Sequence, residues 1–233
     1  YPRFERIVAI SHGARDGLLC SFPGLADRID VILNGTDLMQ DEPRARPGNA
    51  VPRLLSVGRL VSAKNISTML DALAGLPTGT ARYTLLGDGE LRAELTRKAA
   101  RLGLTETVRF AGYVADIRPY LNEADIFVIP SLWEGFGLAA VEAMNAGLPV
   151  VASDIPGLRE VVGDDGTCGI LVDPNSAVEI GNAISSLMAD PDRRREMGRH
   201  ARQRARTFDA DRMVSDYANL IDTVLCGKAS FAQ

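Results

Sequence analysis

The sequence has few of the residues that build disulfide frameworks or metal sites. Among 233 residues there are three cysteines and two histidines, and they never cluster at the spacing of zinc ligands. Cys20, Cys168 and Cys226 are odd in number and far apart, which argues against a disulfide framework and favours a reducing compartment. We therefore expect a core of ordinary size that needs neither disulfides nor metal.

Long apolar runs and an excess of one charge are also missing. No apolar stretch approaches the ~18 residues of a membrane-spanning helix. The formal net charge of -4 gives no electrostatic footprint for nucleic acid. The opening residues carry no signal peptide, and residues 6–10 already have the character of a strand. We expect a cytoplasmic piece of a larger protein, without a nucleic-acid partner.

The chain does contain a regular alternation of short apolar strands and amphipathic helices. This order predicts an α/β fold, a Rossmann-like doubly wound parallel sheet with helices on both faces and further helices at the C-terminal end. The predicted strands are 53–57, 82–86, 108–111, 125–129, 149–152 and 169–172. The predicted helices are 65–74, 90–102, 116–123, 137–145, 157–162, 177–188, 192–206 and 209–225.

Composition divides the chain into parts of unequal size. Residues 41–50 are charged and rich in proline, which is typical of a linker. The divisions we expect are 1–36 as the end of a preceding domain with its connection, 37–50 as linker, 51–206 as the main domain, 207–225 as a closing helix and 226–233 as a frayed tail.

Glycine-rich turns follow several predicted strands, at Gly58, Gly87–Gly89, Gly112 and Ser131–Gly137. Ligands of open parallel sheets bind outside the carboxyl ends of the strands, at a topological switch point. The turns therefore predict a cleft at one edge of the sheet, although doubly wound domains carry some such turns for folding reasons alone. No dinucleotide fingerprint or Walker A sequence is present.

Two cations and two carboxylates stand in or near these turns. Arg59 and Lys64 can hold a diphosphate between a guanidinium and an ammonium group, but solvated loop cations would have the same spacing. Glu134 and Glu142 lie around the start of a helix, where carboxylates can accept hydrogen bonds from sugar hydroxyls and backbone N–H groups can meet an anion. The alternatives are a Glu134 that only complements the helix dipole and a Glu142 that faces solvent.

A paired-carboxylate hydrolase is a further alternative, which would need one acid with a raised pKa. We disfavour it, because a helix N-terminus lowers carboxylate pKa values. Gly135 and Gly137 would let backbone approach a ligand closely, or would simply form a tight turn. We expect Trp133 to pack rather than to stack on a ligand.

Three other patterns favour structural roles. Asp209 and Asp211 match a metal–diphosphate pattern but sit at a predicted helix start, where aspartate is favoured as a cap. His12 beside Ser11 has no third partner that would make a triad. The helix 192–206 and its end carry one stripe of arginines (195, 199, 202, 206) opposite an apolar stripe (197, 201, 205, 208). This pattern favours a solvated surface helix over contact with an anionic membrane.

Taken in order, these segments resemble the C-terminal half of retaining GT-B glycosyltransferases of the family 4 type. The resemblance is carried by SVGRLVSAKN, LLGDGE, VRFAGYV, ADIFVIPS and EGFGLAAVEAMNAGLPVVASDIPGLREVV, and it runs from about Ser11 to Leu225. It implies two Rossmann-like domains with the active site between them. Residues 51–206 would bind the nucleotide sugar, 1–36 would end the acceptor domain, and 207–225 would cross back onto that domain. The family's catalytic histidine lies earlier, so His12 is not its counterpart.

The resemblance also implies roles for individual residues. Arg59 and Lys64 would bind the donor diphosphate and, with Glu134 near the donor sugar, form the catalytic set. Glu142 would grip the ribose hydroxyls. The remaining donor-binding residues that we expect are Gly58, Gly87, Gly112, Tyr113, Val114, Ser131, Gly135, Phe136, Gly137 and Leu138.

The activity implied is transfer of a hexose from a UDP-, GDP- or ADP-sugar with retention and without a metal, in bacterial cell-surface or exopolysaccharide synthesis. The expected partners are the donor and an acceptor domain of the same protein, so the fragment alone would be inactive. Its place would be the cytoplasm, with peripheral contact at the inner face of the membrane as an alternative. Open alternatives are a GT-B-like sugar-nucleotide epimerase or phosphorylase, and a non-catalytic interaction domain of the same fold.

Overall fold

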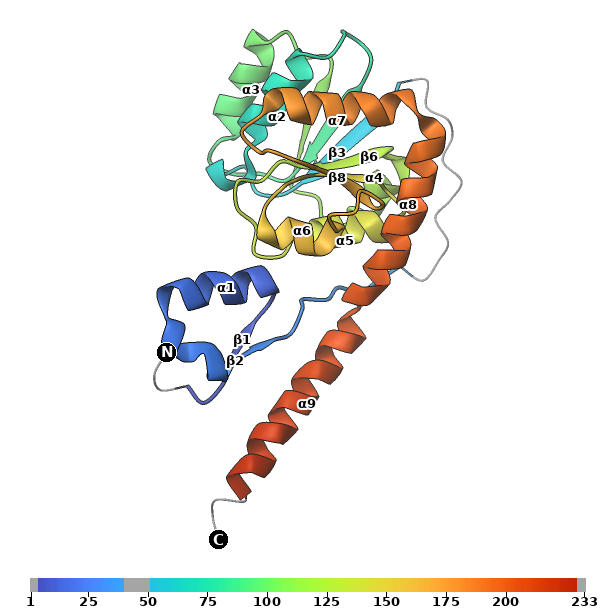
Figure 1. Ribbon diagram of the computed structural model, residues 1–233. Coiled ribbons are helices and arrows are strands. Elements are labelled where there is room, and N and C mark those ends of the chain that lie inside the picture. Colours follow the sequence, from blue (N-terminus) through green and yellow to red (C-terminus); the bar gives the residue numbers. More distant parts are fainter. Residues whose placement is uncertain (1–3, 40–50, 230–233) are drawn as a thin grey trace.

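The computed structural model describes residues 4–39 and 51–229. Figure 1 shows a helix-covered sheet, a smaller N-terminal unit beside it and a long last helix that projects away from both. The proline-rich linker predicted at 41–50 and residues 230–233 of the predicted tail lie outside the described residues.

The main sheet has six parallel strands in the order β5-β4-β3-β6-β7-β8. Its strands are β3 (Arg53–Val57), β4 (Arg82–Leu86), β5 (Val108–Gly112), β6 (Ile126–Ile129), β7 (Val150–Ser153) and β8 (Gly169–Val172). Each of the six predicted strands is present, with ends that differ by no more than one residue. The predicted Rossmann-like α/β class is confirmed.

Helices cover both faces of this sheet. One face carries α2 (Ile66–Ala74), α3 (Arg92–Arg101) and α7 (Ala177–Ala189), and the other carries α4 (Arg118–Glu123), α5 (Leu138–Asn145) and α6 (Pro156–Val162), with α8 (Pro191–Ala205) packed along α5 (Figure 1). Side chains of β6 alternate between the two cores, Ile126 and Val128 into one, Phe127 and Ile129 into the other. A strand buried on both faces needs such a continuous apolar run.

The strand order reverses between β3 and β6. From β3 the chain adds β4 and β5 on one side, and then crosses over to add β6, β7 and β8 on the other. The loops that follow β3 and β6 therefore leave neighbouring strands in opposite directions, which opens a crevice at their carboxyl ends. The short helix η2 (Ser62–Lys64) lies in the first of these loops.

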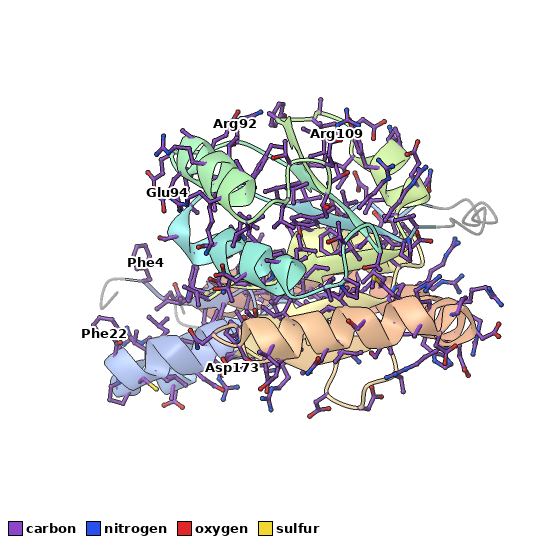
Figure 2. All side chains as sticks on the ribbon, turned by 90° about the horizontal axis from the view of Figure 1, so that it is seen from above. Phe4, Phe22, Arg92, Glu94, Arg109 and Asp173 are labelled. Atoms are coloured by element: carbon purple, nitrogen blue, oxygen red, sulfur yellow. The ribbon has the colours of Figure 1, made fainter. Side chains whose placement is uncertain are left out.

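The N-terminal unit consists of β1 (Ile7–Ala9), α1 (His12–Ser21), η1 (Pro23–Arg28) and β2 (Ile29–Val31). Its two strands pair in parallel, and α1 packs against α6 of the main domain. The sequence predicted the first strand but not the helix. Figure 2 shows Phe4 and Phe22 at the outer end of this unit, where they are 60% and 46% exposed.

The last helix, α9 (Ala210–Ala229), follows the short η3 (Arg206–Phe208). It continues past residue 226, where the sequence predicted a frayed tail. The Asp209 carboxylate accepts a hydrogen bond from the Asp211 N–H at 2.9 Å, which confirms the predicted cap.

The chain that leaves β2 meets the chain that enters α9. The Thr36 N–H donates to the Phe208 carbonyl at 3.0 Å, and the Ala210 N–H donates to the Thr36 carbonyl at 3.2 Å. A Cβ atom on Gly35 would lie 2.5 Å from the Asp209 carbonyl oxygen. Glycine is therefore needed for these two segments to lie so close.

The apolar stripe of α8 and η3 is buried as predicted, with Met197, Ala201, Ala205 and Phe208 each at most 4% exposed. The prediction that the arginine stripe is solvated is wrong at Arg202. This residue is only 9% exposed and so does not belong to a solvated face, because its position on α8 turns it partly toward the core. Within the described ranges, no helix combines the length and apolar character that a membrane crossing requires.

Candidate functional site

Lys64 and Glu134 form an ion pair across the crevice between β3 and β6. Their side chains are 25% and 17% exposed. The buried Ser131 hydroxyl lies 3.5 Å from the same Glu134 oxygen, Oε2, that contacts Lys64. The structure thus brings together three predicted site residues, two of them seventy positions apart in the chain.

Asn65 holds Lys64 in place. Its backbone is left-handed, with φ 54°, a conformation that asparagine tolerates better than most residues. The side-chain amide donates to the Pro130 carbonyl at 3.0 Å and to the Pro174 carbonyl at 2.7 Å. On the other side of Lys64, the Leu132 N–H donates to the Ala63 carbonyl at 2.8 Å. The loop after β3 is therefore fixed to the loop after β6 on both sides of the cation.

The glycine turns after β3, β4 and β5 touch through their backbones. The Gly58 N–H donates to Leu86 at 2.9 Å, and the Gly87 N–H donates to Gly112 at 2.7 Å. Gly87 has φ 128°, and a Cβ there would lie 2.0 Å from the Gly58 carbonyl oxygen. Close packing alone thus requires glycine at 87, and donor binding at these three positions remains a prediction.

The turn 134–137 leads into the positive end of α5. Gly137 occupies the N-cap position with φ 103° and brings no side-chain cap. The Leu138 and Ala139 amides donate no hydrogen bond to another residue in the described part of the chain. They are therefore free to meet an anion. The Phe136 ring is buried against Phe208, with ring centres 5.4 Å apart, so only its backbone can serve the turn.

Glu142 lies one helical turn further along α5 and lines a different cavity. This cavity of about 280 Å³ is bounded by α5, α4, residues 115–118 and the segment that contains Asp37 and Met39. Burial raises the pKa of the Glu142 carboxyl. Three of the predicted donor-binding residues, Gly112 to Val114, directly precede residue 115 of this lining, and Tyr113 is 82% exposed. A smaller space of about 10 Å³ lies beside Lys64, Gly58 and Ser131.

The predicted site is therefore only partly assembled. Lys64, Ser131 and Glu134 meet, whereas Glu142 lines the larger cavity beside α4. The exposed Arg59 side chain makes no hydrogen bond or ion pair within the described ranges. Trp133 is 72% exposed, so the prediction that it packs is wrong. Ser131 turns inward at this point, which directs the next residues of the loop outward.

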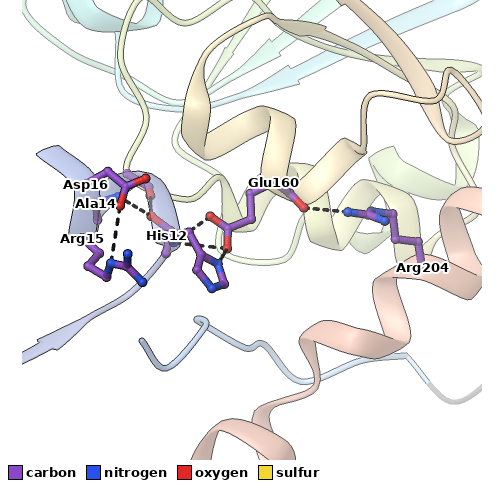
Figure 3. Close-up of polar contacts among 8 residues, drawn as sticks. His12, Ala14, Arg15, Asp16, Glu160 and Arg204 are labelled. Carbon is purple, nitrogen blue, oxygen red and sulfur yellow. Dashed lines mark hydrogen bonds and ion pairs between the residues drawn. The ribbon is translucent and has the colours of Figure 1, made fainter. Parts of the chain in front are cut away.

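The start of α1 makes contacts that the sequence did not predict. Figure 3 shows His12 beside Glu160 of α6. The His12 Nδ1 lies 2.6 Å from Glu160 Oε1, and its backbone N–H donates to Oε2 at 2.9 Å. The neighbouring Ser11 is fully buried. A serine just before a helix is a common N-cap, and this signal would have located both residues.

The chain matches one known protein family over most of its length. Residues 14–204 match the model of the family described as glycosyl transferases group 1. The chain belongs to this family. The match takes in the whole six-stranded sheet and the Lys64–Glu134 pair, and the relatives are of the family 4 type, as the resemblance implied.

Curated relatives of this group 1 glycosyltransferase share about a third of its residues. The lipopolysaccharide core biosynthesis glycosyltransferase LpsE of Rhizobium meliloti is 36% identical over 189 residues, 75% of this chain and 54% of its own length. The glycogen synthase of Mycobacterium tuberculosis is 37% identical over 217 residues, 89% of this chain and 51% of its own. The chain thus spans about half the length of the curated relatives it matches.

Solved structures of GT-B glycosyltransferases have the same fold. HepE of Anabaena, in complex with UDP-glucose, aligns with a TM-score of 0.86 and 27% identity over 95% of this chain and 65% of its own. Sucrose-phosphate synthase of Thermosynechococcus elongatus aligns with a TM-score of 0.84 and 29% identity over 94% of this chain and 58% of its own.

Proposed function

We propose that this group 1 glycosyltransferase binds a nucleotide-diphosphate sugar at the β3–β6 crevice and forms the donor-binding half of a retaining hexosyltransferase. The observation that carries the proposal is the Lys64–Glu134 pair beside the free N-terminal amides of α5. Such a donor has an anionic pyrophosphate next to a polyhydroxylated ring. A cation, a helix N-terminus and a hydrogen-bond acceptor in one place match both parts.

The donor extends along the carboxyl edge of the sheet. Its diphosphate lies between Lys64, Arg59 and the start of α5, and Glu134 accepts hydrogen bonds from the sugar. The nucleoside enters the cavity beside Glu142, whose volume of about 280 Å³ is near the lower end of typical ligand pockets. The related HepE was solved with UDP and with UDP-glucose, which supports a nucleotide-sugar ligand.

Catalysis consists mainly of stabilising the leaving group. As the bond from the anomeric carbon to the diphosphate breaks, negative charge builds on the phosphate oxygens. The acceptor hydroxyl attacks from the same face with retention, and its proton passes to the departing phosphate oxygen. Arg59, Lys64 and the α5 N-terminus stabilise that charge, so the reaction requires no metal. Removing one such preorganised group costs on the order of 3 kcal/mol in the transition state.

Residues 51–206 are the donor domain in this proposal. Residues 1–36 form the end of an acceptor-binding domain and its connection, and the helix 207–225 crosses back onto that domain. Without the rest of that domain the piece does not turn over. The lipopolysaccharide glycosyltransferase among the relatives supports a role in cell-surface polysaccharide synthesis. A cytoplasmic location, at or near the inner face of the membrane, rests on the resemblance alone.

Calorimetric titration with UDP, GDP, ADP and their hexose conjugates tests donor binding. We expect one conjugate to bind the parent chain, and Lys64→Ala and Glu142→Ala to weaken it at least tenfold. Lys98→Ala is the matched control, because Lys98 is similarly buried and pairs with Asp71 at 2.6 Å on the distant α2–α3 surface. No binding by the parent chain would reject the donor role. Equal binding by the Lys64 and Lys98 variants would reject the placement of the site.

A further inference from the structure

Ser11 joins the N-terminal unit to the turn that precedes α5. Its hydroxyl donates to the Gly135 carbonyl at 2.8 Å and accepts from the Ala14 N–H at 2.9 Å. One buried oxygen therefore caps α1 and fixes the backbone one residue after Glu134. No other side chain within the described ranges makes a hydrogen bond to the backbone of residues 134–137.

The opposite side of the same turn rests on α6. A Cβ on Gly157 would lie 2.3 Å from the Glu134 carbonyl oxygen and 3.1 Å from the Gly135 carbonyl carbon. The turn is thus held between a helix of the main domain and a side chain of the N-terminal unit. It cannot move toward α6, and the Ser11 hydrogen bond restrains it from moving away.

The N-terminal unit is itself anchored to α6. Glu160 accepts hydrogen bonds from the His12 backbone N–H and contacts the His12 ring (Figure 3). A Cβ on Gly13 would lie 2.7 Å from the Pro156 Cβ. Arg204 of α8 donates to the Glu160 and Val161 carbonyls at 2.8 and 2.7 Å, which fixes the end of α6. Ser11 therefore links the position of α1 on α6 to the position of the turn.

We propose that Ser11 is a positioning residue that makes the geometry of the donor turn depend on the docking of the N-terminal unit. It acts through the Gly135 carbonyl on Glu134 and on the first amides of α5. This inference rests on the proposed function, because it gives the turn a role in holding the sugar and its diphosphate.

Hydrogen exchange at the turn tests the coupling without a ligand. In Ser11→Ala the Gly135 carbonyl loses its partner. We therefore expect exchange of the Ala140 and Val141 amides, which donate to the Gly137 carbonyl at 2.9 and 3.3 Å, to accelerate about five- to tenfold, as the loss of one net hydrogen bond predicts. Ser11→Thr keeps the hydroxyl and should restore slow exchange. Asp190 caps α8, since its carboxylate accepts a hydrogen bond from the Arg193 N–H at 2.9 Å. Asp190→Ala removes this cap and should leave the turn unchanged.

Ligand titration provides a second and independent measurement. With UDP-glucose, GDP-mannose and ADP-glucose as probes against UDP, GDP and ADP, Ser11→Ala should lower the preference for the sugar conjugate over the free diphosphate about fivefold, because Glu134 meets the sugar. Asp190→Ala should keep that preference. Melting curves of all variants show whether each is folded.

The outcomes separate the two proposals. Unchanged exchange at the Ala140 and Val141 amides in Ser11→Ala overturns the positioning role, whether or not a donor binds. Accelerated exchange in a chain that binds none of the six probes would support the coupling and reject the proposed function. Equal acceleration in Asp190→Ala would show a general loss of stability and would also overturn the positioning role.

Discussion

Replacing Glu134 by glutamine should tighten binding of a free nucleoside diphosphate while it weakens recognition of the sugar. In the ligand-free chain Lys64 is already paired with Glu134, and only about 10 Å³ of space lies beside it. An arriving diphosphate must therefore take Lys64 from Glu134 and approach a carboxylate of its own sign. Glu134→Gln keeps the shape of the side chain and removes both obstacles.

The magnitude follows from the burial of the pair. Exposed pairs contribute about 0–1 kcal/mol, and breaking a buried one costs about 3–5 kcal/mol. The Lys64 and Glu134 side chains are 25% and 17% exposed, so we expect the free energy of breaking their pair to lie between these limits, at about 1–2 kcal/mol. Since about 1.4 kcal/mol is tenfold in affinity, we expect free UDP or GDP to bind roughly five- to thirtyfold more tightly. The advantage of the sugar conjugate over the free diphosphate should fall about tenfold.

Isothermal titration at low and at physiological salt measures both affinities. Glu123→Gln is the control, because Glu123 pairs with Arg53 at 2.8 Å on the exposed surface and should alter neither affinity. Parallel weakening of the free diphosphate and its sugar conjugate by Glu134→Gln would refute the competition between Glu134 and phosphate for Lys64.

Substitutions at Asn65, Glu142 and Gly157 give three further predictions. Asn65→Gly keeps the left-handed backbone but loses the two amide hydrogen bonds, so donor affinity should fall about tenfold, and Asn65→Ala should also lower the melting temperature further because it adds about 1 kcal/mol of backbone strain. Glu142→Gln should raise the melting temperature at pH 7 but not near pH 4. Burial raises the pKa of the Glu142 carboxyl above its ordinary 4.5. The contribution of Glu142 to stability is therefore present below pH 4.5 and is lost as the pH rises through the pKa of the folded state. Gly157→Ala should destabilise the fold by about 1–3 kcal/mol through overpacking against the turn. At Gly17 an added Cβ would meet nothing within 4 Å, so Gly17→Ala should stabilise the fold by about 0.5–1 kcal/mol. Thermal unfolding of both variants measures these changes.

The fold could be predicted from the sequence where burial leaves a local pattern. Residues 126–129 form a continuous apolar run because both faces of β6 are covered, and the turn glycines mark the ends of the strands. The helix α1 was missed because no residue of HGARDGLLCS is fully buried. Its apolar face is short and only partly buried, with Ala14, Leu18 and Leu19 packed against a small cluster, so the cap at Ser11 was the clearest mark of its start.

The site was predictable in part. Lys64 and Glu134 were assigned from residue types and from the resemblance, and the strand order explains why loops so distant in sequence meet. The cavity beside Glu142 could not be foreseen, because it depends on how α4 and residues 37–39 close over α5. Arg202 and Trp133 were assigned the wrong exposure for the same reason, since long-range packing decides it.

The hydrogen-bonded crossing of Thr36 with residues 208–210 constrains how the molecule can bend. Both described passages between the main sheet and the outlying elements run through this one spot, tied by the Thr36 and Ala210 amides. Two segments joined by hydrogen bonds at one place can rotate about that place but resist sliding past each other. A swing of the N-terminal unit against the sheet would also have to break the contacts of Ser11 with Gly135 and of His12 with Glu160, whereas the crossing at Thr36, where Gly35 has no side chain, is the point about which such a motion would turn.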